Sequence, residues 1–418
     1  MKKRTLLVAL IIMALVATTV FAGGSSESKS DKKTVTYWSM WNEAEPQGQV
    51  LAQAAESFEE ETGIFVDIVF NGREIRKTLQ PALEAGEKID MFDEDITRVN
   101  SNWGKFLLPL ETYVTKSYPT TGGKSFSDSV SKALLDLARQ EGGGTLKVVP
   151  YQPFAFVVMY NQDLFDKAGI TSTPNTWAEF EVAAAKLVKS GVTPITVDDA
   201  YMAAFFGYNM SRLIGVEATV AMANNNDFSN PAVKEFGRIW SDAAKKGWIS
   251  KKAASNIYPS GQIEEVAAGK VAMYLNGTWL PNEIKGNAPN MNWGSFAWPA
   301  MSPNGAGTEA NNYGAQCFGI NNNSEVADEA FQFAVYMTTG KWDSELAKQS
   351  LGVPMGTSSE WPKQTAGAKK VIDNTTTWMT WAVGMENSAD VNSKIKENFA
   401  KLITLSLDAD SFYAAMNK

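Results

Sequence analysis

Aromatic, amide and carboxylate side chains recur where the predicted strands of this sequence end. The set consists of Trp41, Asn42, Glu43, Glu45, Gln47, Asn71, Arg73, Asp93, Glu94, Asp95, Tyr151, Gln152, Asn276 and Trp279. In open α/β sheets, ligands bind beyond the carboxyl ends of the strands. We therefore expect these side chains to contribute to one ligand-binding site.

These residue types suit a carbohydrate. An indole can cover the C–H face of a pyranose, and carboxylates, amides and an arginine can hydrogen-bond with its hydroxyl groups. Trp279 is the strongest aromatic candidate, because Gly277 allows a tight turn from which a helix can start. An indole on the first turn of that helix is expected to face the ligand.

Other aromatic and acidic residues are assigned to the interior or left open. Trp38 lies inside a strand pattern and Trp177 in a helix-capping segment, so we expect both to serve packing, and Cys317 to be buried in a late strand. The sequence does not decide whether the remaining candidates line the site: Trp293, Trp298, Trp378, Trp381, Asp198, Asp199 and Tyr201.

The composition excludes several kinds of chemistry. The chain has no histidine, so Ser-His-Asp and Cys-His catalytic systems and histidine metal sites cannot form. Cys317 is the only cysteine, which excludes an internal disulfide and a cysteine-rich metal site. Phosphate-binding glycine motifs are missing, and the net charge of −8 argues against a nucleic-acid partner. We expect no catalytic residue, metal or cofactor.

Strand and helix patterns alternate along the chain, as in α/β proteins. Strands are predicted at residues 34–38, 64–70 and 89–92, with amphipathic helices at 47–61 and 78–85 between them. A long β-prone segment follows up to residue 160. A capping box of Thr176 and Glu179 begins a helix over 176–188, and a strand over 271–275 leads into a turn at 276–279. Further helices are predicted at 231–246, 327–338 and 391–406.

The first residues carry an export signal. Lys2, Lys3 and Arg4 precede an apolar run that ends at Phe21, and small residues follow. We expect a signal peptide over residues 1–22, cleaved after Ala22, and a polar tether over 23–33. Because Gly23 stands where a lipid-bearing cysteine would be needed, we expect a periplasmic location.

Four segments together resemble the extracellular solute-binding proteins of ABC importers, in their carbohydrate-binding branch. They are YWSMWNEAEPQ with ETGIFVDIVF, VVPYQPFAFVVMYNQDLFDKAGITSTPNTWAEF, EEVAAGKVAMYLNGTWLPNEI and GAQCFGINNNSEVADEAFQFAVYM. They follow one another in the family's order and span nearly all of the chain after the export signal. None of them is a catalytic motif.

The resemblance implies an α/β, two-lobed periplasmic-binding-protein-like fold with a hinge and an interlobe ligand cleft. Lobe one would take residues 34–149 plus 311–345, and lobe two residues 150–310 plus 346–418, with Val149-Pro150 as a hinge. A length of 418 residues also favours two lobes. The implied function is non-enzymatic: a monomer captures a sugar or oligosaccharide and delivers it to an integral-membrane ABC permease.

Two alternatives remain open at this point. A secreted glycan-active enzyme could use two carboxylates, for example Asp93 and Asp199, because paired carboxylates are the minimal requirement for glycoside hydrolysis. The same fold could also bind a non-sugar solute, since the acidic cluster would suit an amine. The identity, length and linkage of a sugar do not follow from the sequence.

Overall fold

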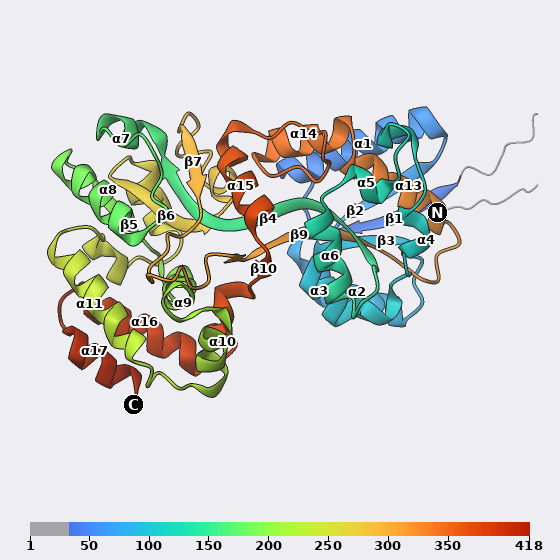
Figure 1. The fold of residues 1–418 in the computed structure, drawn as a ribbon. Helices are drawn as coiled ribbons and strands as arrows, with labels where there is room; N and C mark the ends of the chain where they lie inside the picture. Colours follow the sequence, from blue (N-terminus) through green and yellow to red (C-terminus); the bar gives the residue numbers. More distant parts are fainter. Residues whose placement is uncertain (1–32) are drawn as a thin grey trace, which may run out of the picture. The chain divides into compact units, whose positions relative to one another are not determined.

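A computed structural model of the chain describes residues 33–418 (Figure 1). The predicted signal peptide over residues 1–22 and the tether up to residue 32 lie outside the described residues. No helix within residues 33–418 combines the length and the apolar character needed to cross a lipid bilayer.

One mixed sheet contains most of the strands, in the order β2-β1-β3-β9-β4-β6-β5, with β7 paired to β4. A separate two-stranded sheet joins β8 and β10. The strands are β1 (Thr34–Ser39), β2 (Phe65–Phe70), β3 (Met91–Asp95), β4 (Val148–Asn161), β5 (Thr193–Thr196), β6 (Val271–Gly277), β7 (Trp293–Phe296), β8 (Ala310–Asn311), β9 (Tyr313–Ile320) and β10 (Thr377–Trp378).

The helices lie between and after these strands, singly or in consecutive groups. They are α1 (Pro46–Thr62), α2 (Ile75–Glu84), α3 (Ile96–Trp103), α4 (Glu111–Val114), α5 (Phe126–Ser129), α6 (Lys132–Glu141), α7 (Gln162–Lys167), α8 (Trp177–Lys189), α9 (Met202–Ile214), α10 (Val216–Asn225), α11 (Pro231–Lys245), α12 (Leu280–Glu283), α13 (Ala327–Thr338), α14 (Lys341–Ser350), α15 (Ala366–Asn374), α16 (Ala389–Ile403) and α17 (Ala409–Met416).

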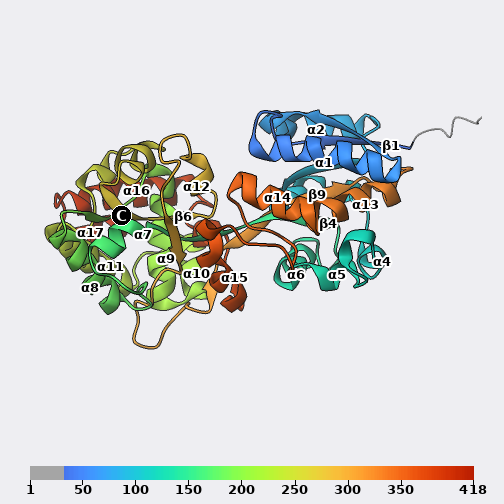
Figure 2. The ribbon, with the colours of Figure 1, turned by 90° about the horizontal axis from the view of Figure 1, so that it is seen from above.

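Strand β4 connects two groups of strands. Its first half, Val148–Ala155, pairs antiparallel with β9, and its second half pairs with β6 and β7. The segment can occupy this central position because it is almost continuously apolar, as strands covered on both faces are. Around the first half, α1, α13 and α14 pack together on one face (Figure 2), whereas α3 and α6 contact β4 and β9 from the other (Figure 1).

Local sequence signals explain several helix ends. Gly63 closes α1 in the left-handed conformation, with φ of 74°, which glycine adopts without a side-chain penalty. Thr176 and Glu179 form both hydrogen bonds of a capping box at the start of α8. The helix predicted at 327–338 coincides with α13, and the predicted alternation of strands and helices over residues 34–92 is confirmed.

Two strands extend further than predicted. Strand β3 continues through Asp93 and Glu94 to Asp95, because these residues pair with Gln316, Cys317 and Phe318 of β9. Strand β6 continues through Asn276 to Gly277, which pairs with Phe156 of β4. In both cases a strand from elsewhere in the chain supplies backbone partners that the local sequence does not reveal.

Candidate functional site

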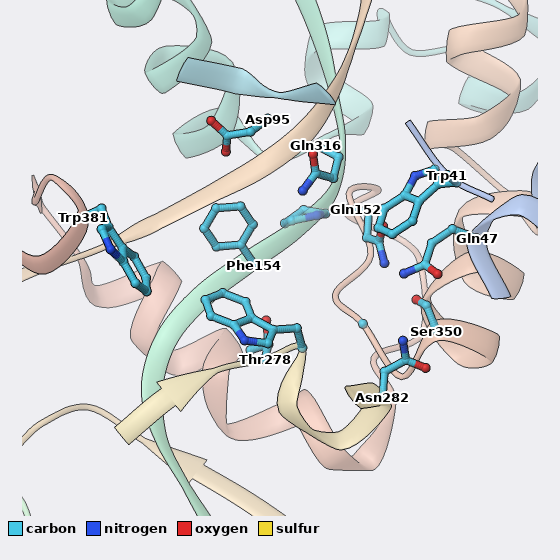
Figure 3. A pocket seen from close by; sticks show the side chains of 13 residues that line it. Trp41, Gln47, Asp95, Gln152, Phe154, Thr278, Asn282, Gln316, Ser350 and Trp381 are labelled. Atoms are coloured by element: carbon cyan, nitrogen blue, oxygen red, sulfur yellow. The ribbon is translucent and has the colours of Figure 1, made fainter. Parts of the chain in front are cut away.

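The ends of strands β1, β3 and β6 and the middle of β4 meet at a pocket of about 290 Å³, which we call the aromatic pocket. Aromatic residues, amides and one carboxylate share its walls: Trp41, Gln47, Asp95, Gln152, Pro153, Phe154, Thr278, Trp279, Asn282, Gln316, Ser350, Gly352 and Trp381. Figure 3 shows Trp41 and Gln47 on one side, Trp381 on the other, and Gln152, Gln316 and Phe154 between them.

Trp41 is held by a chain of buried hydrogen bonds. Its indole Nε1 donates to the hydroxyl of Tyr151 at 2.7 Å, and that hydroxyl donates to the carboxylate of Asp93. The other Asp93 oxygen accepts from the backbone N–H of Met40 at 2.6 Å. Trp41 itself is only 7% exposed, so this chain fixes the orientation of the indole at the pocket wall.

Burial raises the pKa of Asp93 to about 6, although hydrogen bonds from Tyr151, Met40, Tyr37 and Ser39 act in the opposite direction. Removal of the carboxylate from water disfavours its charged form, and this effect exceeds that of the hydrogen bonds. Asp93 therefore changes protonation state near neutral pH, directly behind an indole that lines the pocket.

Three glutamines that line the pocket have buried carbonyl oxygens with no partner among the described residues. Gln47 begins α1, Gln152 lies in β4 and Gln316 lies in β9, and each lines the pocket. The buried Oε1 atom of each has no hydrogen-bond partner among the described residues. An unpaired buried acceptor costs roughly 1–3 kcal/mol, so the pocket favours a ligand that brings several hydroxyl donors.

Gln152 owes its position to an irregularity in β4. The register with β9 shifts between Tyr151 and Pro153, and Gln152 lies in the left-handed region with φ of 45°. A bulge of this kind re-aims a side chain, and positive φ is strained for a residue with a Cβ. The strained residue lies at the pocket, and strained residues in proteins cluster at ligand-binding sites.

Trp279 is the N-cap residue immediately before the short helix α12 and lines the pocket from the β6 side. Its ring lies 5.5 Å from that of Phe154 and 6.3 Å from that of Trp381, and its Nε1 donates to the hydroxyl of Tyr201 at 3.4 Å. The expected helix-start placement of Trp279 is confirmed. The role of Gly277 differs from our expectation: a Cβ there would lie 2.1 Å from the Trp279 ring, so glycine provides space for the indole rather than a positive φ.

We expect Gly277→Ala to lower the free energy of unfolding by about 1–3 kcal/mol, the usual cost of an added methyl group in a packed site. In a Trp279→Ala background the same change should cost much less, because the overlapping ring is absent. Urea denaturation of the four proteins of this cycle measures the coupling. Additive effects would show that Gly277 is required for a reason other than the indole.

Trp381 completes the aromatic wall through an unusual turn. It opens the short 3₁₀ helix η8 (Trp381–Gly384), in which Ala382 and Val383 have φ of 51° and 53°. The indole Nε1 donates to Glu386 at 2.8 Å. Gly207 of α9 permits the close approach of this turn, because a Cβ there would lie 2.3 Å from the carbonyl oxygen of Ala382.

Asp95 is the only ionisable side chain among the described residues that line the aromatic pocket. One of its oxygens accepts from the backbone N–H groups of Thr97 and Arg98, at 3.0 and 3.3 Å, at the start of α3. Burial raises the pKa of this carboxyl group. The lining formed by the described residues therefore contains one carboxylate and no cationic side chain, which suits an uncharged ligand rich in hydroxyl groups.

Comparison with known proteins identifies the chain. Residues 42–342 match the family described as bacterial extracellular solute-binding protein. The chain belongs to this family. A protein of Brucella abortus described as a binding protein is 24% identical over 257 residues, 59% of this solute-binding protein and 57% of the relative. That match thus covers less than two thirds of the relative's length.

Two other similarities cover more of the solute-binding protein. The multiple sugar-binding protein of Streptococcus mutans is 23% identical over 336 residues, 76% of this chain and 74% of the relative. A solved chitin oligosaccharide binding protein superposes with a TM-score of 0.64 at 20% identity, covering 93% of this chain and 98% of that one. The α/β, two-lobed periplasmic-binding-protein-like fold expected from the sequence is thereby confirmed; the lobe boundaries stay predictions.

The structure brings five of the predicted site residues of the solute-binding protein to the aromatic pocket: Trp41, Gln47, Asp95, Gln152 and Trp279. Asp93 and Tyr151 lie behind Trp41 and support it. Glu94 points away from Asp93 along β3, as alternate strand residues do, and forms ion pairs with Arg76 and Arg98 at 2.7 and 2.6 Å.

The other predicted residues contact one another or the backbone, outside the pocket lining. Arg73 forms a bidentate ion pair with Glu45, with both N–O distances 2.9 Å, and Asn42 also donates to Glu45. Asn71 donates to the carbonyl of Val69, Asn276 accepts from the N–H of Gly277, and Glu43 is exposed. As ligand contacts, all the predicted residues of the solute-binding protein remain proposals.

Of the residues that the sequence analysis did not assign, one lines the aromatic pocket and the others make contacts elsewhere. Trp381 lines the pocket, whereas Trp293 and Trp298 are buried around a different cavity. Trp378 donates to the carbonyl of Tyr313, Asp198 accepts from Tyr274 and Gly261, and Asp199 accepts from the N–H of Tyr258. Tyr201 supports Trp279. As expected, Trp177 serves packing, stacked on Phe180, and Cys317 is buried; Trp38 is only partly buried.

Besides Trp381, which was left open, the sequence did not single out the remaining pocket residues: Pro153, Phe154, Thr278, Asn282, Gln316, Ser350 and Gly352. Gln316 lies on a strand that passes the end of β3 in the antiparallel direction, so the strand-end rule does not select it. Ser350 ends α14, Gly352 lies just beyond it, and neither carries a local signal. Phe154 shares a β-prone run with interior residues and is not distinguished from them.

Proposed function

We propose that this protein is the substrate-binding component of an ABC importer and captures a sugar or oligosaccharide in the aromatic pocket. The observation that carries the proposal is the composition of that pocket. Four aromatic side chains lie beside three amide oxygens that have no partner among the described residues. Aromatic faces match the C–H face of a sugar ring, and the amides match its hydroxyl donors. The names of the sugar-binding relatives support the same ligand class.

The pocket supports a binding role without catalysis. Glycoside hydrolysis requires two carboxylates on either side of the reacting bond, and Asp95 is the only carboxylate among the described residues of the pocket lining. Asp93 and Asp199, the pair considered for an enzyme, are occupied by hydrogen bonds outside that lining. We therefore expect glycans incubated with the protein to remain uncleaved.

The remaining parts of the proposal concern location and partners. We infer a periplasmic monomer that closes its lobes, 34–149 plus 311–345 and 150–310 plus 346–418, around the ligand. It would then deliver the ligand to an integral-membrane permease. A bound sugar must be desolvated on both faces for tight binding, which a hinged pair of lobes can achieve. The export signal in the sequence and the extracellular family support this location.

A calorimetric screen of mono- and oligosaccharides, amines and peptides tests the proposed ligand class. We expect at least one neutral saccharide to bind with a dissociation constant on the order of 1 μM, which corresponds to about −8 kcal/mol. At a hundredfold excess over that constant, the ligand should stabilise the fold by about 2.7 kcal/mol and raise the melting temperature.

Asp95→Asn separates the sugar from an amine ligand. The amide keeps hydrogen-bonding capacity but removes the charge, so a neutral sugar should lose little affinity whereas an amine should lose most of it. Binding of amines or peptides alone in the full screen would contradict the sugar assignment and leave the family unaffected.

A further inference from the structure

A second cavity, of about 750 Å³, lies against strand β7, and we call it the β7 cavity. Its lining residues lie mainly in β7, the loop that follows it to β8, the segment 172–175 and helix α15; Figure 1 shows α15 next to β7. Helix α15 packs directly on the backbone of β7, because a Cβ on Gly367 would lie 2.2 Å from the carbonyl oxygen of Ser295. None of its lining residues belongs to the aromatic pocket.

The charge of the β7 cavity is opposite to that of the protein. Lys363 and Lys370 line it, and its described lining contains no aspartate or glutamate, although the chain as a whole has a net charge of −8. Neither lysine forms an ion pair with another residue of the described chain. Of the acidic residues next to the lining in the sequence or the fold, Asp163 accepts from Asn292 at 3.0 Å and Glu179 caps α8, whereas Glu309, between the lining residues Thr308 and Ala310, interacts electrostatically with Arg212.

A third cation lies beneath the cavity wall. Arg212 is fully buried, and its guanidinium donates to the carbonyl oxygens of Trp298, Gly307 and Ala310. No carboxylate pairs with it within the described residues. Burial lowers the pKa of Arg212 to about 10, so the group stays charged at neutral pH and contributes positive potential to a wall that includes Trp298 and Ala310.

Two buried polar groups of the cavity wall are also without a partner. Ser295 is 7% exposed and Trp298 is 2% exposed. The hydroxyl Oγ of Ser295 and the indole Nε1 of Trp298 have no hydrogen-bond partner among the described residues. Buried polar atoms in proteins are nearly always hydrogen-bonded, and amides from Asn175 and Asn374 add further hydrogen-bonding groups.

We propose that the β7 cavity is a second ligand site, which takes a small hydroxylated anion such as a sugar carrying a carboxylate or a phosphate. Lys363 and Lys370 pair with the anionic group, and Ser295, Trp298 and the asparagines bind hydroxyl groups. The volume lies within the range of small-molecule sites. This site differs in charge from the aromatic pocket, so one protein binds a neutral and an anionic molecule at separate places.

Calorimetry with glucuronic acid, glucose 6-phosphate and glucose tests the proposal on the full chain. We expect at least one of the two anions to bind, with a preference of at least about tenfold over glucose, since a hydrogen bond to a charged group contributes about that factor. The affinity should fall as salt rises, because screening shortens the reach of the charges. A response to only one of the anions identifies whether a carboxylate or a phosphate is preferred.

Matched variants locate the site. Lys363→Gln with Lys370→Gln should weaken anion binding at least about tenfold, whereas Lys369→Gln should not. Lys369 is the neighbour of Lys370 on α15, but it pairs with Asp373 at 2.7 Å and does not line the cavity. Melting temperatures of all variants should stay close to that of the wild type, since these lysines are exposed.

Three outcomes would overturn the inference. They are the absence of anion binding at millimolar concentration, anion binding that the double lysine variant leaves unchanged, and anion binding that Trp279→Ala abolishes. The last outcome would assign the anion to the aromatic pocket. None of them bears on whether a neutral sugar binds there, so the two proposals fail independently.

Discussion

Trp279→Ala should weaken binding of the saccharide at least about thirtyfold, because truncation of a well-packed aromatic anchor typically costs 2 kcal/mol or more. The indole lines the pocket beside Phe154 and Trp381. It is only partly buried, so the ligand-free protein should lose less stability than the 3–5 kcal/mol typical of a core tryptophan. Titration calorimetry and ligand-free melting curves measure the two effects separately.

Trp177→Ala is the matched control. Trp177 is also a partly buried tryptophan packed on an aromatic ring, with its centroid 4.7 Å from that of Phe180, but it does not line the aromatic pocket. This variant should lose stability and keep its affinity. If Trp279→Ala instead unfolds readily while its folded fraction binds normally, Trp279 is a core residue and the site is misplaced.

The contribution of Asp93 to the free energy of unfolding should increase as the pH falls through 6. Its pKa is about 6 in the folded protein and about 3.9 in an unfolded chain. Between these values the folded state retains a proton that the unfolded state has released, so stability rises with acidity and levels off below pH 4. A difference of about two pKa units corresponds to roughly 3 kcal/mol.

Asp93→Asn isolates this contribution, because other carboxyl groups titrate equally in both proteins. Relative to the wild type, the variant should gain roughly 2 kcal/mol between pH 4.5 and 7.5 as the charged carboxylate becomes costly. Urea denaturation across this range measures the difference. A constant difference would show that Asp93 has an ordinary pKa. Asp343, whose buried carboxyl also has a pKa raised to about 6 but which does not line the aromatic pocket, serves as the comparison.

Ligand affinity should change in the opposite direction to stability. Charged Asp93 accepts from Tyr151, which in turn accepts from the indole of Trp41. Protonation removes the charge that strengthens this chain, and the nearby Tyr37, Tyr151 and Cys317 cannot replace it, because burial raises their pKa values. We therefore expect weaker saccharide binding below pH 6 in the wild type and no such step in Asp93→Asn.

The strand-end rule found the parts of the site that belong to parallel strands and their following turns. Trp41, Asp95 and Trp279 satisfy it directly, because each lies just beyond or at the end of a strand that the local pattern predicts. The rule does not select residues on a strand that runs antiparallel to these strands. Gln316 reaches the pocket from the middle of β9, and only the pairing of β9 with both β3 and β4 shows this.

Residue type could not separate ligand contacts from their supports. Asp93, Glu94 and Asp95 are consecutive acidic residues, yet the first holds Tyr151, the second binds two arginines and the third lines the pocket. Because successive residues of a strand point to opposite faces, Glu94 points away from Asp93 and Asp95. This arrangement requires β3 to continue to Asp95. Trp381 was undecided for a similar reason, since its place depends on the left-handed turn at Ala382 and Val383.

The single thiol of the chain can report how often the strands around it separate. Cys317 lies in β9 opposite Glu94 of β3 and Pro150 of β4, is fully buried, and donates to the carbonyl of Glu94 at 3.4 Å. Burial also raises its pKa, so alkylating reagents can react only with molecules in which these strands have separated. The rate of alkylation therefore measures how often these strands separate. A ligand that holds β3 and β4 together will slow the alkylation.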